Sequence, residues 1–193
     1  MKSIVLKVTL ILFVFATTFS FAKHQTEKEI EKNETIKVAL LLDTSNSMDG
    51  LINQAKAQLW EIINELSYAK YGQQKPDLEI ALYEYGNSNL SAKEGYIKQV
   101  LPFSNDLDEI SEKLFSLTTN GGNEFCGQVI QTSVNELSWG KNKNDLRLLF
   151  IAGNEPFTQG KINYKEAVAN AKEKKIVVNT IFCGSYTNGI SGM

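Results

Sequence analysis

The segment Val38-Ala39-Leu40-Leu41-Leu42, followed directly by Asp43-Thr44-Ser45-Asn46-Ser47-Met48, decides the fold of this chain. A short apolar run that ends at polar turn residues indicates a buried β-strand. The strand delivers one carboxylate and two hydroxyl groups, those of Asp43, Ser45 and Ser47, to the loop at its C-terminal end. Open α/β sheets bind ligands at this edge, and hard divalent cations prefer oxygen ligands. The loop is therefore a candidate metal site, and the alternative is a turn that only caps the following helix.

Helices and strands alternate along the rest of the sequence. Apolar residues at helical spacing predict helices after Asp49-Gly50, from residue 106 to 117, from Glu124 to residue 137 and near residues 164–171. Buried apolar runs predict strands over residues 78–85, 146–151 and 176–182, and a shorter alternation over residues 96–101, ended by Pro102, predicts an edge strand. This order indicates an α/β fold with a Rossmann-like, open, mostly parallel sheet, helices on both faces and one antiparallel edge strand.

The first residues have the pattern of a secretory signal peptide. Lys2 and Lys7 give the start of the chain a positive charge, and an apolar segment from Val8 to Ala22 follows. This segment ends at Ser20-Phe21-Ala22, which places small residues where a signal peptidase cleaves. We therefore divide the chain into a signal peptide (1–22), a polar linker (23–35), one domain (36–184) and a C-terminal tail (185–193) that is either complete or truncated. This division predicts an exported protein, periplasmic or extracellular. An uncleaved N-terminal anchor is the alternative, and it alone would place the chain at a membrane.

Charge and rare residues exclude several classes of function. Removal of residues 1–22 takes away two lysines and no acid, which moves the formal net charge from −2 to −4. An acidic chain without a basic stripe is a poor binder of nucleic acid. The one histidine, His24, lies in the linker, which leaves no ordinary Ser-His or Cys-His catalytic pair. Cys126 and Cys183 are the only cysteines, and they are either a disulfide or two buried thiols.

The motif Asp43-x-Ser45-x-Ser47-Met48, placed after a buried strand and before an amphipathic helix, resembles the first loop of the von Willebrand factor type A (vWA) domain. The order of elements from residue 36 to 184 is similar as well. The resemblance implies a vWA-like three-layer sandwich and a metal-ion-dependent adhesion site (MIDAS) with Asp43, Ser45 and Ser47 as first-loop ligands. The implied ion is usually Mg²⁺, sometimes Ca²⁺ or Mn²⁺, and its open position takes a carboxylate from a partner protein.

The second loop departs from the family pattern. The family places a threonine after a glycine pair, whereas Gly121-Gly122 is followed here by Asn123 and Glu124. Thr118 and Thr119 lie a few residues earlier. Asn123 offers a carbonyl oxygen, and Glu124 offers a carboxylate that the usual pattern lacks.

The third loop departs too. Asn154 stands where the family has an aspartate, with Glu155 beside it. An asparagine keeps an acceptor oxygen but removes one negative charge from the neighbourhood of the ion. The resemblance thus implies a partly degenerate MIDAS. It binds metal with Asn123 or Glu124 as substitute ligands, binds metal only when a partner carboxylate completes the shell, or has lost the metal.

Three functions follow from these readings. The first is an exported protein-binding module that recognises a partner carboxylate through a divalent metal held by Asp43, Ser45 and Ser47, with Asn123, Glu124 and Asn154 completing the shell. The second is a metal-independent envelope scaffold of the same fold. The third is a metal-assisted hydrolase with Glu124 or Glu155 as base, although we expect no enzyme.

Overall fold

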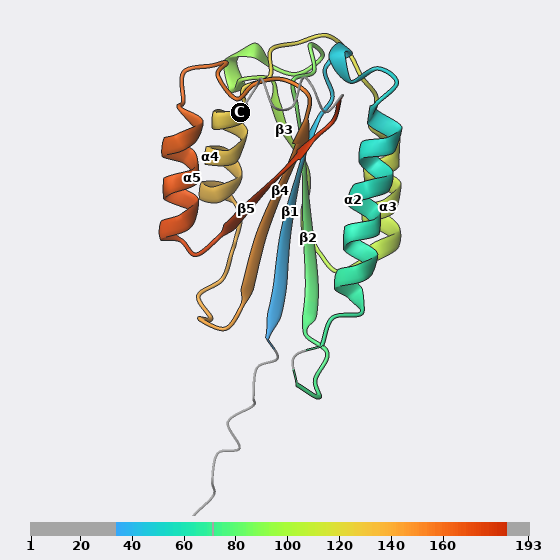
Figure 1. Cartoon of the computed structure of the whole chain (residues 1–193), viewed down its shortest axis with the longest axis vertical. Helices are drawn as coiled ribbons and strands as arrows, with labels where there is room; N and C mark the ends of the chain where they lie inside the picture. Colours follow the sequence, from blue (N-terminus) through green and yellow to red (C-terminus); the bar gives the residue numbers. More distant parts are fainter. Residues whose placement is uncertain (1–33, 71, 185–193) are drawn as a thin grey trace, which may run out of the picture. The chain divides into compact units, whose positions relative to one another are not determined.

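The computed structural model describes residues 34–70 and 72–184, which form a sheet with strand order β3-β2-β1-β4-β5 (Figure 1). The strands are β1 (Thr35–Asp43), β2 (Asp77–Tyr85), β3 (Ile97–Ser104), β4 (Leu146–Gly153) and β5 (Val177–Phe182). All neighbouring strands are parallel except β2 and β3, which are antiparallel. The predicted fold class, with its antiparallel edge strand, is confirmed.

In the described part of the chain, four α-helices cover the two faces of the sheet. Helices α2 (Ile52–Ser67) and α3 (Leu107–Ser116) lie on one face, and α4 (Cys126–Glu136) and α5 (Tyr164–Glu173) lie on the other (Figure 1). Two short 3₁₀ turns, η1 (Asn46–Met48) and η2 (Ala92–Glu94), follow β1 and precede β3. Helices α2, α3, α4 and α5 begin or end near the positions that the apolar spacing predicts.

Strand β1 forms the centre of the core because both of its faces are covered. Val38, Leu40 and Leu42 point into the cluster under α2 and α3, whereas Ala39 and Leu41 point into the cluster under α4 and α5. All five side chains are fully buried. A strand that is buried on both faces reads as a continuous apolar run, which is why the segment before Asp43 has no polar alternation.

Strand β3 corrects one expectation. We predict an edge strand ended by Pro102, but β3 continues through Pro102 to Ser104. Proline lacks the N–H that a central strand needs, whereas an edge strand tolerates its absence. The pairing of β2 with β3 also shifts register near Leu82, and such an irregularity accommodates a residue that cannot complete the ladder.

The two cysteines are free thiols, so the buried-thiol alternative is the one present. Cys126 is 1% exposed and Cys183 is 8% exposed. Cys183 belongs to the cluster on the α2 and α3 face, and Cys126 belongs to the cluster on the α4 and α5 face. The sheet separates the two clusters, and this placement explains why the two sulfurs do not pair.

The signal peptide (1–22), most of the linker (23–33) and the tail (185–193) lie outside the described residues. Strand β1 begins at Thr35, the last residue of the predicted linker. None of the helices in the described part of the chain is long and apolar enough to span a bilayer.

Candidate functional site

The loops that follow β1, β2 and β4 meet the loop before α4 at the carboxyl edge of the sheet, which is the upper edge in Figure 1. Asp43 lies between two of them. A Cβ atom added to Gly86, after β2, would lie 2.8 Å from Asp43 Oδ1, and one added to Gly153, at the end of β4, would lie 3.1 Å from Asp43 Oδ2. The carboxylate therefore fits between two backbone segments that only glycine allows to approach so closely.

Asp43 is a buried acid, and one of its two carboxylate oxygens has no hydrogen-bond partner among the described residues. Its Oδ1 accepts the backbone N–H of Ser45 at 2.9 Å, whereas its Oδ2 is buried without a hydrogen-bond partner among the described residues. Burial is the largest cause that raises the pKa of Asp43 from 3.8 to about 6. Hydrogen bonds from Ser45 lower this pKa, whereas the negative charges of Glu124 and Glu155 raise it further. A buried carboxylate with a free oxygen is costly, and a cation beside it would remove that cost.

A chain of hydrogen bonds joins the first loop to the third. The hydroxyl oxygens of Ser45 and Ser47 lie 2.9 Å apart, and the Ser47 hydroxyl donates to Asn154 Oδ1 at 2.8 Å. Asn154 Nδ2 in turn donates to the carbonyl of Ser47 at 2.9 Å. The structure thus brings Asp43, Ser45, Ser47 and Asn154 together, as the sequence predicts.

The second loop, before α4, contacts the first loop through residues other than the expected Asn123. The backbone N–H of Asn120 donates to the carbonyl of Thr44 at 3.0 Å. The Thr119 hydroxyl donates to the carboxylate of Asp49. Asn123, a predicted ligand, is exposed, and no hydrogen bond within the described residues ties it to Asp43, Ser45 or Ser47. Asn120 and Thr119, rather than Asn123, connect this loop to the first loop and to Asp49 just after it.

Glu124 does reach the site. It is 7% exposed, and its Cγ lies 3.2 Å from the Cβ position at Gly86, so it is a close neighbour of the Asp43 carboxylate. Its Oε2 accepts a hydrogen bond from Gln159 Nε2 at 2.7 Å. No local pattern singles out Gln159, because the bond joins two loops that only the tertiary fold brings together.

The donor set fits a hard cation better than a soft one. No group of three Asp, Glu, His or Cys side chains in residues 34–70 and 72–184 is placed to hold a metal, so any ion here depends on hydroxyl and amide oxygens as well as Asp43. The separation of 2.9 Å between the Ser45 and Ser47 hydroxyls resembles the distance of about 3 Å between neighbouring ligands of six-coordinate magnesium. Asp43 Oδ2, which has no hydrogen-bond partner among the described residues, is an oxygen that could bring negative charge to such an ion.

A family model and several solved structures match this chain. The model of the von Willebrand factor type A domain matches residues 37–189. No protein of curated function matches the sequence. The crystal structure of the SpRpn10 VWA domain has a TM-score of 0.59 and 15% identity, and the match covers 82% of this chain and 79% of that one.

Two further structures are similar in fold. An aerotolerance-related membrane protein from Bacteroides fragilis has a TM-score of 0.54 and 16% identity, over 77% of this chain and 68% of that chain. Proximal thread matrix protein 1 from the mussel byssus, in a form with a zinc-occupied MIDAS motif, has a TM-score of 0.58 and 12% identity. That match covers 77% of this chain and 38% of the mussel protein, so this chain spans little more than a third of the mussel protein's length.

Proposed function

Because this chain belongs to the von Willebrand factor type A domain family, whose members commonly mediate protein interactions, we propose that it binds a protein partner at the carboxyl edge of its sheet through a divalent metal ion. Asp43, Ser45 and Ser47 would hold the ion, and Asn154 would support Ser47. Asn123 and Glu124 would shape or complete the shell. When bound, the ion supplies an electron-poor centre that attracts a partner's carboxylate oxygen.

The observation that carries this proposal is the unpartnered oxygen of Asp43. Native proteins rarely leave a buried carboxylate oxygen without a donor or a cation. Here Oδ2 lacks any partner within the described chain, and the neighbouring Glu124 and Glu155 charges also favour a cation. The two serine hydroxyls are neutral ligands, so they would leave the ion with most of its charge unquenched for an incoming acid.

Thermal unfolding in magnesium tests the proposal directly. We expect MgCl₂ to raise the Tm of the protein, calcium or manganese to act similarly, and EDTA to reverse the rise. Ser47→Ala should reduce the rise, because it removes a hydroxyl ligand from an exposed position without disturbing the core. Ser116→Ala, at the exposed end of α3, is the matched control and should respond like the wild type.

Two outcomes would favour other functions. A Tm that does not respond to magnesium, calcium, manganese or EDTA would favour a metal-independent scaffold of the same fold. The proposal contains no catalytic step, and metal-dependent hydrolysis that is lost on Glu124→Gln would contradict it.

We also propose that the protein is exported, because residues 1–22 have the pattern of a secretory signal peptide. The expected mature protein begins near residue 23. Mass spectrometry of the protein recovered outside the cytoplasm checks the cleavage site, and a product that retains residues 1–22 would contradict removal of a signal peptide.

A further inference from the structure

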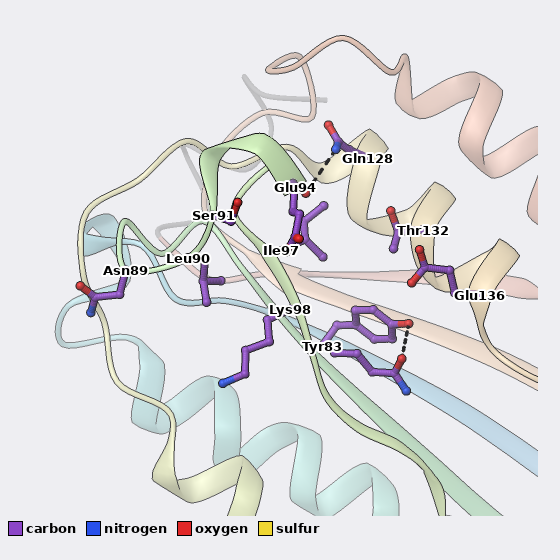
Figure 2. Close-up of a pocket in the computed structure, with 11 residues that line it drawn as sticks. Tyr83, Asn89, Leu90, Ser91, Glu94, Ile97, Lys98, Gln128, Thr132 and Glu136 are labelled. Atoms are coloured by element: carbon purple, nitrogen blue, oxygen red, sulfur yellow. Dashed lines mark hydrogen bonds between the residues drawn. The ribbon is translucent and has the colours of Figure 1, made fainter.

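A groove separate from the Asp43 site runs between the edge strand β3 and helix α4 (Figure 2). Its volume is about 770 Å³, a size typical of ligand sites. Tyr83, Ile97 and Gln99 of the sheet line it on one side, and Gln128, Thr132 and Glu136 of α4 line it on the other. Residues four apart on a helix share one face, so the three α4 side chains form a continuous polar wall.

Hydrogen bonds fix both boundaries of the groove. The Tyr83 hydroxyl donates to Gln99 Oε1 at 3.2 Å, and Gln128 Nε2 donates to the carbonyl of Glu94 at 3.4 Å. The second bond depends on Gly95, which has a φ of +79° and whose added Cβ would lie 2.4 Å from Gln128 Nε2. The groove is therefore preformed, which lowers the entropic cost of binding.

The charge in this groove is negative and unpaired. Glu136 and Glu94 both line the groove, and within the described part of the chain neither forms an ion pair. Among the described residues that line the groove, Lys98 is the one cation, and its ammonium pairs with Glu84 at 3.5 Å. Figure 2 shows Lys98 directed away from the α4 side, whereas Glu136 and Thr132 project from α4 toward Tyr83.

The Glu136 charge acts on Tyr83, a residue of the opposite wall of the groove. The Glu136 carboxylate contributes to the raised pKa of Tyr83, about 12, which burial chiefly causes. Glu136 is also the last residue of α4, where the helix dipole disfavours an acid. The nearby ammonium of Lys174 donates instead to the carbonyl of Val134 and to Asn135 Oδ1.

We propose that this groove is a second protein-docking site, independent of metal, which takes an arginine side chain of an extended partner segment. A guanidinium offers five N–H donors, and the groove offers the Glu136 carboxylate with amide and hydroxyl acceptors beside it. Among the residues that the structure describes, β3 is an edge strand of the sheet, which leaves the groove open to a partner along its length. Charge complementarity selects a cationic occupant over an acidic one.

Binding of short blocked peptides to the isotope-labelled chain tests the proposal. The probe is acetyl-Gly-Arg-Gly-amide, and the matched ligand is the same peptide with citrulline, whose neutral urea has nearly the same shape. We expect saturable shifts of amide NMR signals from Tyr83, Gln99 and Thr132, and binding of citrulline about tenfold weaker because the charge-assisted bond is lost. The expected shifts persist in EDTA.

Variants separate this site from general surface charge. Glu136→Gln should weaken arginine-peptide binding about tenfold, whereas Glu112→Gln on α3 should leave it unchanged. Glu136 is exposed, so the variant should fold, and an unchanged amide spectrum without peptide checks this. Equal binding of arginine and citrulline peptides, preference for acetyl-Gly-Glu-Gly-amide, shifts confined to other surfaces or no saturable shift would each overturn the proposal. None of these results bears on the metal site.

Discussion

Asn154 holds Ser47 at two points: its Oδ1 accepts the Ser47 hydroxyl at 2.8 Å, and its Nδ2 donates to the Ser47 carbonyl at 2.9 Å. An aspartate would accept from the hydroxyl but has no donor for the carbonyl. The amide therefore secures the first loop without a metal, and a carboxylate at the same place would add charge for an ion. With asparagine at position 154, the third loop gains the hydrogen bond to the Ser47 carbonyl and lacks the negative charge that an aspartate would bring.

Asn154→Asp should strengthen magnesium binding at least tenfold, because it adds a negative charge next to Ser47. The same change should destabilise the metal-free protein by about 1–2 kcal/mol. The Ser47 carbonyl would lose its hydrogen-bond donor, and the new carboxylate would be repelled by the other acidic groups near Asp43. Calorimetric titration with MgCl₂ and urea unfolding in EDTA measure the two effects. Unchanged magnesium affinity would show that residue 154 is remote from the ion.

The pH dependence of the metal-free protein should show the burial of Asp43. Its pKa is raised from 3.8 to about 6, so between these pH values the folded state binds more protons than the unfolded state. The free energy of unfolding should therefore fall as the pH rises through this window and level off above pH 6. The raised pKa corresponds to a loss of up to about 3 kcal/mol.

Asp43→Asn should flatten this part of the pH profile and make the metal-free protein more stable than the wild type at pH 7, while it removes the response to magnesium. Asp77→Asn is the control, because Asp77 is an exposed acid at the start of β2, whereas Asp43 lies beside Tyr85 at the end of β2. Urea unfolding in EDTA at a series of pH values supplies the data. A wild-type profile that matches that of Asp43→Asn would contradict the buried-acid account.

Gly153→Ala should destabilise the protein by about 1–3 kcal/mol, because the new methyl group would lie 2.6 Å from the Tyr85 hydroxyl and 3.1 Å from Asp43 Oδ2. The double variant Gly153→Ala with Tyr85→Phe removes the closer clash and should recover part of the loss. Denaturant unfolding of the two variants and of Tyr85→Phe alone forms the cycle. Strictly additive effects would mean that the methyl group does not meet the hydroxyl.

Arg147 stabilises the opposite end of the sheet. Its guanidinium donates to the carbonyls of Trp139, Gly140, Asn142 and Lys174. Arg147→Met leaves these carbonyls without their donor and should cost about 3 kcal/mol or more of unfolding free energy. Arg147→Lys should recover only part of it, since an ammonium has three donors on one atom.

The magnesium affinity of folded Arg147→Lys should equal that of the wild type, because the residue lies near the start of β4, far along the strand from Gly153. Denaturant unfolding and calorimetric titration separate the two properties. A variant that loses magnesium binding while it remains folded would contradict the assignment of Arg147 to stability alone.

The sequence predicts elements well where local pattern decides them. The apolar run before Asp43 marks a central strand because both of its faces are buried, and the polar residues after it mark the carboxyl edge. That placement brings Asp43, Ser45, Ser47 and Asn154 together in the structure as expected.

Contacts between distant loops are beyond the reach of local pattern. The bond from Gln159 to Glu124 joins residues 35 positions apart. Asn123 is exposed, whereas Thr119 and Asn120 make the hydrogen bonds to the first loop and the turn after it. The continuation of β3 past Pro102 depends on its place at the edge of the sheet, which only the strand order reveals. The separation of Cys126 from Cys183 is likewise a property of the assembled layers.

Anomalous diffraction at the manganese edge, from crystals of the chain soaked in MnCl₂, tests most directly whether Asp43, Ser45 and Ser47 hold a divalent ion. We expect one strong anomalous peak bonded to oxygens of these three residues, and no peak in crystals of Asp43→Asn treated in the same way. Wild-type crystals without a peak at these residues, at manganese concentrations that saturate other vWA metal sites, would contradict this expectation.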